Sequence, residues 1–268
     1  MNGVSIVIAT FNASSTLAAT LESIADQCDV DWSTVEVIVV DGGSSDSTVQ
    51  IARNSGICDR IVSEPDRGVY DAMNKGAAIA QNEWLHFQNA GDTFYGRGSL
   101  AEVMHVARDA ASGGHPWFIA GAINESIVGG PARIPSVPHR WSVHALGLQP
   151  HCHQATWFRR DVFAAMGGHS LELGTAADYD MIIRFGLVGR PHASNSILVS
   201  YQGGGMSAVG PIETSRRQHA VRVVRFELAG ALRIADAAFS SVTGTIRAAR
   251  VRTGRVRRRI QSFIDRLH

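Results

Sequence analysis

Val37-Ile38-Val39-Val40-Asp41-Gly42-Gly43 decides the fold, because a run of β-branched residues is followed at once by an acid and two glycines. The same form recurs where Glu83-Trp84-Leu85-His86-Phe87 leads into Gln88-Asn89-Ala90-Gly91-Asp92. Continuous apolar runs are typical of parallel strands covered on both faces, and open parallel sheets bind ligands at the carboxyl ends of their strands. Two strands that each bring an acid to that edge predict a site for a nucleotide diphosphate and its divalent cation.

Strand-like and helix-like runs alternate through the first half of the chain. Strands are expected at residues 4–9, 35–40, 60–63 and 84–87. Helices are expected between them, near residues 17–24, 49–52 and 69–80. Ser14 or Ser15 is the expected N-cap of the first helix. This alternation with short loops predicts a doubly wound α/β fold with a mostly parallel sheet and flanking helices.

The chain of 268 residues, 45% of them hydrophobic, has the size of one large domain with an appendage. Residues 1–212 are expected to form the α/β domain, with a long loop and an extra strand at residues 123–148. Residues 213–268 are expected to form a helical, arginine-rich extension, broken near Thr243-Gly244. Met1-Asn2-Gly3 leads straight into a strand, and the three cysteines form no CxxC pair, which together favour a cytoplasmic protein without a secretory signal.

The net charge of +1 hides an uneven distribution along the chain. Residues 247–268 hold eight arginines and one aspartate, a net charge of +7, which leaves −6 for the first 246 residues. A basic end on an acidic body favours an anionic partner, either a membrane surface or nucleic acid. The acidic body and the lack of interleaved aromatic residues argue against nucleic acid. An apolar stripe beside the arginines favours peripheral attachment to the inner face of the plasma membrane. A helix packed on the domain with a solvated charged face is the alternative. The stripe comprises Val221, Val224, Leu228, Leu232 and Ala235.

Four motifs in this order resemble the family 2 inverting glycosyltransferases of GT-A fold, and they lie at residues 5–12, 39–46, 63–76 and 89–92. The run Glu64-Pro65-Asp66-Arg67-Gly68-Val69-Tyr70-Asp71-Ala72-Met73-Asn74-Lys75-Gly76 is most similar to the colanic-acid and mycobacterial phenolic-glycolipid branch. The resemblance covers about residues 4–210. It implies transfer of a sugar from a UDP-, GDP- or dTDP-sugar to a hydroxyl of a glycan or glycolipid, with inversion at the anomeric carbon.

The resemblance implies that Asp92 binds a divalent cation, Mg²⁺ or Mn²⁺. A hard cation held by carboxylate oxygens neutralises the diphosphate as the glycosidic bond breaks. Asn89 and Gly91, also assigned to the donor site, replace the first acid and the third residue of the family's acidic motif, so the site is less anionic. An aspartate that only shapes the turn is the alternative for Asp92.

The resemblance also assigns Thr10, Asn12 and Asp41 to the base and ribose of the donor. Gly42 stands where many relatives have a second acid. A simple strand-to-helix turn is the alternative for Asp41.

Asp66 and Arg67 lie on the loop after the third strand, where Arg67 could face the base or a phosphate. A solvated arginine is the alternative. Lys75 is assigned to the donor as well, although it stands four residues after Asp71, a spacing at which oppositely charged side chains pair on a helix.

An inverting transfer needs one general base, and Asp178 matches that position of the family. Ala177 stands where many relatives have glutamate. Asp180 points elsewhere on a helix and is expected to pair with Arg184. The alternative for Asp178 is an aspartate that stabilises the start of its helix.

His153 and Gln154 resemble a pair near the acceptor in this branch. Structural histidines are equally compatible with this segment, and a zinc site is disfavoured because the histidines and Cys152 lack a standard ligand spacing. Residues 203–207 resemble a loop that closes over bound donor, and an ordinary glycine-rich surface loop is the alternative.

Two functions from other classes remain open on the sequence. A catalytically silent nucleotide-sugar-binding or scaffold protein would bind nucleotide without turnover, and the changes at Asn89, Gly91 and Ala177 keep this reading open. A protein that binds nucleic acid through its arginines would show steep salt dependence. The sequence also leaves a homodimer open.

Overall fold

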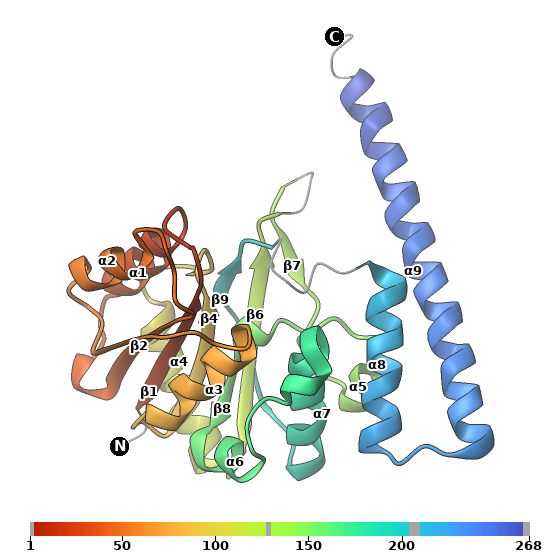
Figure 1. Ribbon diagram of the computed structural model, residues 1–268, viewed down its shortest axis with the longest axis horizontal. Helices are drawn as coiled ribbons and strands as arrows, with labels where there is room; N and C mark the ends of the chain where they lie inside the picture. Colours follow the sequence, from red (N-terminus) through yellow and green to blue (C-terminus); the bar gives the residue numbers. More distant parts are fainter. Residues whose placement is uncertain (1–2, 127–129, 204–209, 265–268) are drawn as a thin grey trace. The chain divides into compact units, whose positions relative to one another are not determined.

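The computed structural model describes residues 3–126, 130–203 and 210–264 (Figure 1). The chain forms two compact units, Met1–Gly203 and Gly204–His268. This division lies before the boundary expected after residue 212.

The first half of the larger unit is a parallel sheet with the strand order β3-β2-β1-β4. Its members are β1 (Val4–Thr10), β2 (Val35–Asp41), β3 (Arg60–Ser63) and β4 (Trp84–Asn89). All residues of β1 and β2 are buried, as their apolar runs predict. The chain runs outward from β1 to β3 and then returns to β4 on the other side of β1, so strand order reverses between β1 and β4. Thr10 pairs with Asp41, and Ala9 with Asn89, so the three strands end at one edge.

The second half of the sheet is mixed, so the parallel arrangement does not extend through the whole unit. Its strands are β5 (Thr93–Phe94), β6 (Trp117–Asn124), β7 (Ala132–Ile134), β8 (Thr156–Arg159) and β9 (His192–Tyr201). β8 lies antiparallel between β4 and β6, while β9 is parallel to β6. β5 and β7 add antiparallel pairs to β9 and β6.

Helices cover both faces of this sheet (Figure 1). They are α1 (Leu17–Ala25), α2 (Thr48–Asn54), α3 (Val69–Ile79), α4 (Ser99–Ser112), α5 (Trp141–Ala145), α6 (Arg160–Ala165) and α7 (Ala177–Val188). Short 3₁₀ helices precede β2, β8 and α7, respectively: η1 (Trp32–Thr34), η2 (His153–Ala155) and η3 (Leu171–Ala176). Alternate β1 residues enter two cores: Ile6 packs in the core with α1 and α4, and Val7 in the core with α3 and α7.

Two local expectations are wrong. Thr16, and neither Ser14 nor Ser15, occupies the N-cap of α1, without a capping side-chain hydrogen bond. The C-terminal helices are α8 (Pro211–Arg225) and α9 (Gly230–Ile264), so the break lies at residues 226–229 and not at Thr243-Gly244. Glu227, after the end of α8, and Gly230, the first residue of α9, have positive φ values of 49° and 52°.

Gly244 has a different role, because a Cβ there would lie 3.2 Å from Ile212 Cα. The glycine therefore allows α9 to approach α8 closely. The break also divides the expected apolar stripe between two helices, and Val221 is buried whereas Val224 is exposed. Among the described residues, no helix combines the length and the apolarity needed to cross a bilayer.

α3 approaches the sheet closely at Gly76, because a Cβ there would lie 2.3 Å from Val7 Cγ1. We expect Gly76→Ala to lower the free energy of unfolding. Overpacking costs about 1–3 kcal/mol, more than the gain of about 1 kcal/mol in helix propensity. Urea denaturation measures the difference. Adding Val7→Ala should recover part of the loss, and strictly additive effects of the two substitutions would contradict this packing.

Candidate active site

Asp41 lies at the carboxyl end of β2, where it organises the loop that follows. Its carboxylate accepts hydrogen bonds from Ser44 N at 2.9 Å, Ser63 Oγ at 2.8 Å and Thr10 Oγ1 at 3.3 Å, and also from Gly43 N and Ser44 Oγ. Burial raises the pKa of Asp41, but the donors, led by Ser44, outweigh burial and hold the pKa below its usual value. Thr10 and Asp41 are thus together at this edge, with Asp41 bound to the protein's own donors.

Asn12 joins the loops after β1 and β2. Its φ of 46° lies in the left-handed region, and its backbone N–H donates to Ser44 Oγ at 2.7 Å. Its side-chain oxygen accepts from Ser45 N at 3.0 Å. Asn12 therefore lies beside Asp41 and fixes the shape of the edge.

Asp66 reaches the same edge from the loop after β3. A Cβ on Gly42 would lie 2.5 Å from Asp66 Oδ2, so the Asp66 carboxylate occupies the space that a side chain at position 42 would need. Its other oxygen accepts from Gly68 N at 2.7 Å. An acid from the loop after β3 therefore stands where a side chain at position 42 would lie.

Arg67 and Lys75 are paired with nearby acids in this structure. Arg67 Nη2 lies 3.2 Å from Asp71 Oδ1, with 77% of the arginine side chain exposed. Lys75 Nζ lies 2.8 Å from Glu64 and 3.6 Å from Asp71. The pairing of Lys75 with Asp71 is the structural role that their spacing predicts.

Asp92 is buried where the ends of β4 and β9 meet η2. Its Oδ2 accepts from Gln154 Nε2 at 3.0 Å, and its Oδ1 from Gln202 N at 3.0 Å. Its carbonyl oxygen accepts from Thr20 and Gln88, while Gly91 N donates to Thr20 Oγ1. Burial raises the pKa of Asp92, and the Gln202 N–H is the strongest of the groups that oppose this rise.

The residues around Asp92 can supply only part of a metal-ion shell. Within the described ranges, no group of three or more His, Cys, Asp and Glu side chains could hold a metal ion. The Asn89 side chain lies against the Asp92 carboxylate, and its buried Oδ1 has no hydrogen-bond partner among the described residues. One carboxylate and one amide oxygen suit a hard cation whose remaining ligands come from a diphosphate and water.

Asp178 lies in the first turn of α7, and 26% of its side chain is exposed. Its Oδ1 accepts from Tyr179 N at 2.7 Å, and its Oδ2 lies 3.6 Å from His153 Nδ1. Burial raises the pKa of Asp178, whereas His153 lowers it. Burial and the nearby Asp178 carboxylate hold the pKa of Tyr70 far above its usual value.

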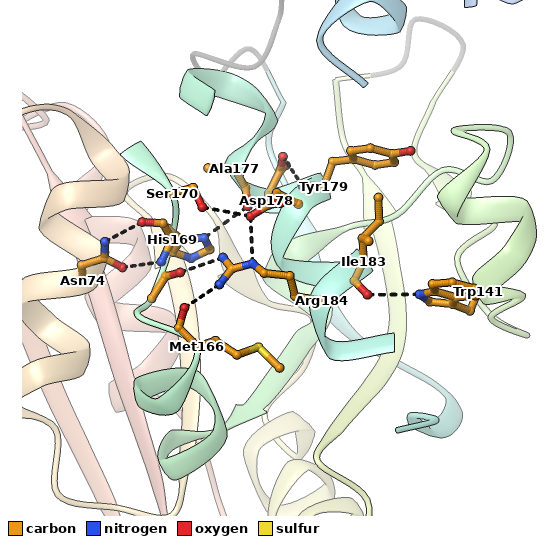
Figure 2. A network of polar contacts seen from close by, with 12 residues as sticks. Asn74, Trp141, Met166, His169, Ser170, Ala177, Asp178, Tyr179, Ile183 and Arg184 are labelled. Carbon is orange, nitrogen blue, oxygen red and sulfur yellow. Dashed lines mark hydrogen bonds and ion pairs between the residues drawn. The ribbon is translucent and has the colours of Figure 1, made fainter. Parts of the chain in front are cut away.

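A buried polar network fixes the start of α7 (Figure 2). Arg184 Nε pairs with Asp180 Oδ2 at 2.9 Å, as expected, and its other nitrogens donate to the carbonyls of Met166 and Gly168. Asn74 on α3 exchanges two hydrogen bonds with the His169 backbone. The network thereby connects α3 and α7, and it holds the turn that carries Asp178.

Ala177 is fully buried in the core beside α3. A glutamate at this position would place a carboxylate in an apolar environment. This packing gives a physical reason for the alanine next to Asp178.

η2 brings Asp92 and Asp178 into one site. Its consecutive residues face different carboxylates, Gln154 toward Asp92 and His153 toward Asp178. Both charges also act on buried Cys152 and, after burial itself, help to raise the pKa of its thiol to about 12. His153 Nε2 is buried without a hydrogen-bond partner among the described residues. The sequence indicated each of these residues, but missed Tyr70 and Gln202 as their neighbours.

Three further histidines, His139, His144 and His151, pack against one another with ring centroids 5.3–5.5 Å apart. Burial lowers the pKa of His139 to about 4, that of His144 to about 3, and that of His151 well below its usual value. These rings are neutral structural histidines near neutral pH. They do not meet the geometry of a metal site in the described part of the chain.

Trp157 and Phe158 are buried, one in each of the two cores. Of the loop expected to close over the donor, residues 204–207 lie outside the described residues.

Sequence comparison identifies relatives with named activities. The family described as Glycosyl transferase family 2 matches residues 5–165. A PGL/p-HBAD biosynthesis glycosyltransferase of Mycobacterium bovis is 36% identical over 189 residues, 67% of this chain and 68% of the relative. A glycosyltransferase of Mycobacterium tuberculosis is 31% identical over 208 residues, 76% of this chain and 77% of the relative.

Solved structures share the fold at low sequence identity. S. aureus TarS 1–349 in complex with UDP-GlcNAc has a TM-score of 0.65 and 17% identity, covering 86% of this chain and 69% of that chain. This chain spans 41% of the longer S. aureus TarS structure. The mannosyltransferase PcManGT from Pyrobaculum calidifontis, in complex with GDP-Man and Mn²⁺, has a TM-score of 0.65 and 16% identity, covering 93% and 75%. The chain therefore belongs to glycosyl transferase family 2, and its α/β unit has the GT-A fold of a glycosyltransferase.

Proposed function

We propose that this glycosyltransferase moves a sugar from a nucleotide-sugar donor to a hydroxyl of a glycan or glycolipid, with inversion at the anomeric carbon. The observation that carries the proposal is η2, whose neighbouring side chains contact Asp92 and Asp178. The name of the M. bovis relative supports a glycolipid acceptor. The ligands in the TarS and PcManGT structures support a nucleotide-sugar donor and a divalent cation.

In this reaction Asp178 is the general base. Its carboxylate takes the proton of the acceptor hydroxyl while that oxygen attacks the anomeric carbon, and the nucleoside diphosphate leaves from the opposite side. A half-buried carboxylate with a raised pKa is a stronger base than one in water. Its partial exposure leaves it reachable by an acceptor.

We assign the donor to the edge formed by β1, β2 and β4. The Asp92 carboxylate and the Asn89 side-chain amide oxygen would hold a divalent cation together with the diphosphate, with Gly91 in the same turn. When bound, the cation supplies Lewis-acid neutralisation of the leaving group. Gln154 and the Gln202 N–H orient the Asp92 carboxylate.

The nucleoside lies, in this proposal, against Thr10, Asn12 and Asp66. Asp41 positions this edge and does not bind the nucleoside directly, because its carboxylate accepts hydrogen bonds from Thr10, Ser44 and Ser63. Arg67 and Lys75 would exchange their acidic partners for donor phosphates.

We expect Asp178→Asn to bind nucleotide with an affinity close to that of the wild type and to lose turnover. Removing a general base lowers kcat by about 10²–10⁴-fold. The measurement is release of nucleoside diphosphate from whichever UDP-, GDP- or dTDP-sugar the wild type uses, with calorimetry for binding. Exposed Asp161→Asn on α6 is the control. Turnover retained by Asp178→Asn would refute the role of Asp178.

His153 is expected to position and tune Asp178. Asp178 must be deprotonated to act, so activity falls as pH drops through its pKa. The His153 imidazole lowers that pKa, so His153→Gln should move the acid limb of the kcat profile to higher pH while nucleotide affinity is unchanged. The exposed His105→Gln on α4 is the control. A lower kcat with an unmoved acid limb would mean that His153 acts only through packing.

Calorimetric titration of UDP, GDP and dTDP, each with and without Mn²⁺, tests the donor site. We expect one nucleotide to bind in a metal-dependent manner. Asp92→Asn should weaken that binding at least about tenfold, because the variant loses the one carboxylate of the cation site. Asp109→Asn, exposed on α4, should bind as the wild type does. Folded wild-type protein that binds none of the three nucleotides would contradict the proposed donor site.

A further inference from the structure

The helices of the second unit pack through a polar interface. Asp236 of α9 accepts from Arg222 Nε at 2.8 Å and lies 2.6 Å from His219 Nδ1, both on α8. Arg222 is buried and also donates to Ser240 Oγ. An ion pair and hydrogen bonds therefore occupy the centre of the contact, where paired helices usually bury apolar side chains.

The polar interface continues along α9. Arg247 Nη1 donates to Gln218 at 3.3 Å and to Ser215 Oγ at 3.4 Å, and Gly244 lies against Ile212. The α9 residues at this contact, Asp236, Ser240, Gly244 and Arg247, recur at intervals of three or four residues. They therefore lie on one face of the helix.

The opposite face of α9 is apolar and exposed. It contains Ala231, Ala235, Ala238, Val242 and Ile246, which also recur at intervals of three or four residues. Val242 is 58% exposed and Ile246 48%. Leu232 and Ile234, on the two borders of this face, are 70% and 72% exposed. We call these seven residues the α9 apolar face. Its amphipathicity is the reverse of that of a helix that packs on a core, because the polar face is covered and the apolar face is not.

We propose that the α9 apolar face inserts into the surface of an anionic lipid bilayer, with the helix lying in the plane of the interface. Charge complementarity selects this occupant, because the sequence of residues 247–268 carries eight arginines and a net charge of +7. Arginine-rich helices with an apolar face bind anionic membranes in this way. Val256 and Ile260 continue the apolar spacing in the sequence.

Two other occupants fit less well. A second copy docked through α9 would bring two segments of charge +7 together, which repel each other. Nucleic acid would contact a charged face through its phosphates, and it offers no surface that favours burial of Val242 and Ile246.

Co-sedimentation of the full chain with vesicles tests this proposal. Wild type should bind vesicles of phosphatidylcholine and phosphatidylglycerol in equal parts, and should bind pure phosphatidylcholine at least about tenfold more weakly. Val242→Asp with Ile246→Asp should reduce binding to the anionic vesicles at least about tenfold. The matched control is Ala237→Asp with Ser241→Asp, which adds the same charge at exposed positions outside the α9 apolar face and should retain most of the binding. Circular dichroism establishes that both variants are folded.

Each contrary result overturns the proposal. If wild-type protein remains in the supernatant when the anionic vesicles sediment, the α9 apolar face does not bind membranes. If both paired variants lose vesicle binding equally, the net charge of the protein, and not the α9 apolar face, accounts for the binding. A dimer in sedimentation equilibrium that is lost only in the Val242/Ile246 variant, without vesicle binding, would assign the face to a second copy. Duplex DNA binding that withstands both variants, without vesicle binding, would assign the arginines to nucleic acid.

Discussion

The buried Asp92 carboxylate is the constraint on which the site depends. A buried charge must be matched by donors, and its donors come from distant segments, Gln154 of η2 and the Gln202 N–H after β9. Thr20 and Gln88 hold its carbonyl oxygen in the same place. Satisfying this one acid therefore fixes the end of β4 against η2 and the end of β9.

The second acid depends on the first through the geometry of η2. Once Gln154 faces Asp92, the preceding His153 side chain faces Asp178. On the other side, the network of Arg184 and Asn74 holds α7 against α3 (Figure 2). Asp92 follows β4 and Asp178 lies in the first turn of α7, so the contacts of both acids with η2 and the packing of α7 against α3 together set their separation.

Departures from the family pattern have local explanations in the fold. Asp66 occupies the space beside Gly42, so an acid stands near the end of β2 without being part of it. Ala177 is buried in the core beside α3, where a larger charged residue would be unfavourable. The chain belongs to glycosyl transferase family 2.

The sequence by itself determined β1 to β4 and the helices between them, because buried parallel strands require continuous apolar runs and helices require a period of 3.6 residues. It also indicated Asp92, because the end of a strand is a local feature, and it indicated Asp178 through the resemblance of its segment to the family. Only the tertiary structure decided the antiparallel direction of β8, the role of Gly244 and the polar contact between α8 and α9. It alone joined Asp92 to Gln154, 62 residues away, and to Gln202, 110 residues away. Local periodicity reports which face of an element is buried, but not the direction of a strand, its neighbour or the side chain across the contact, since these are set by how the whole chain packs.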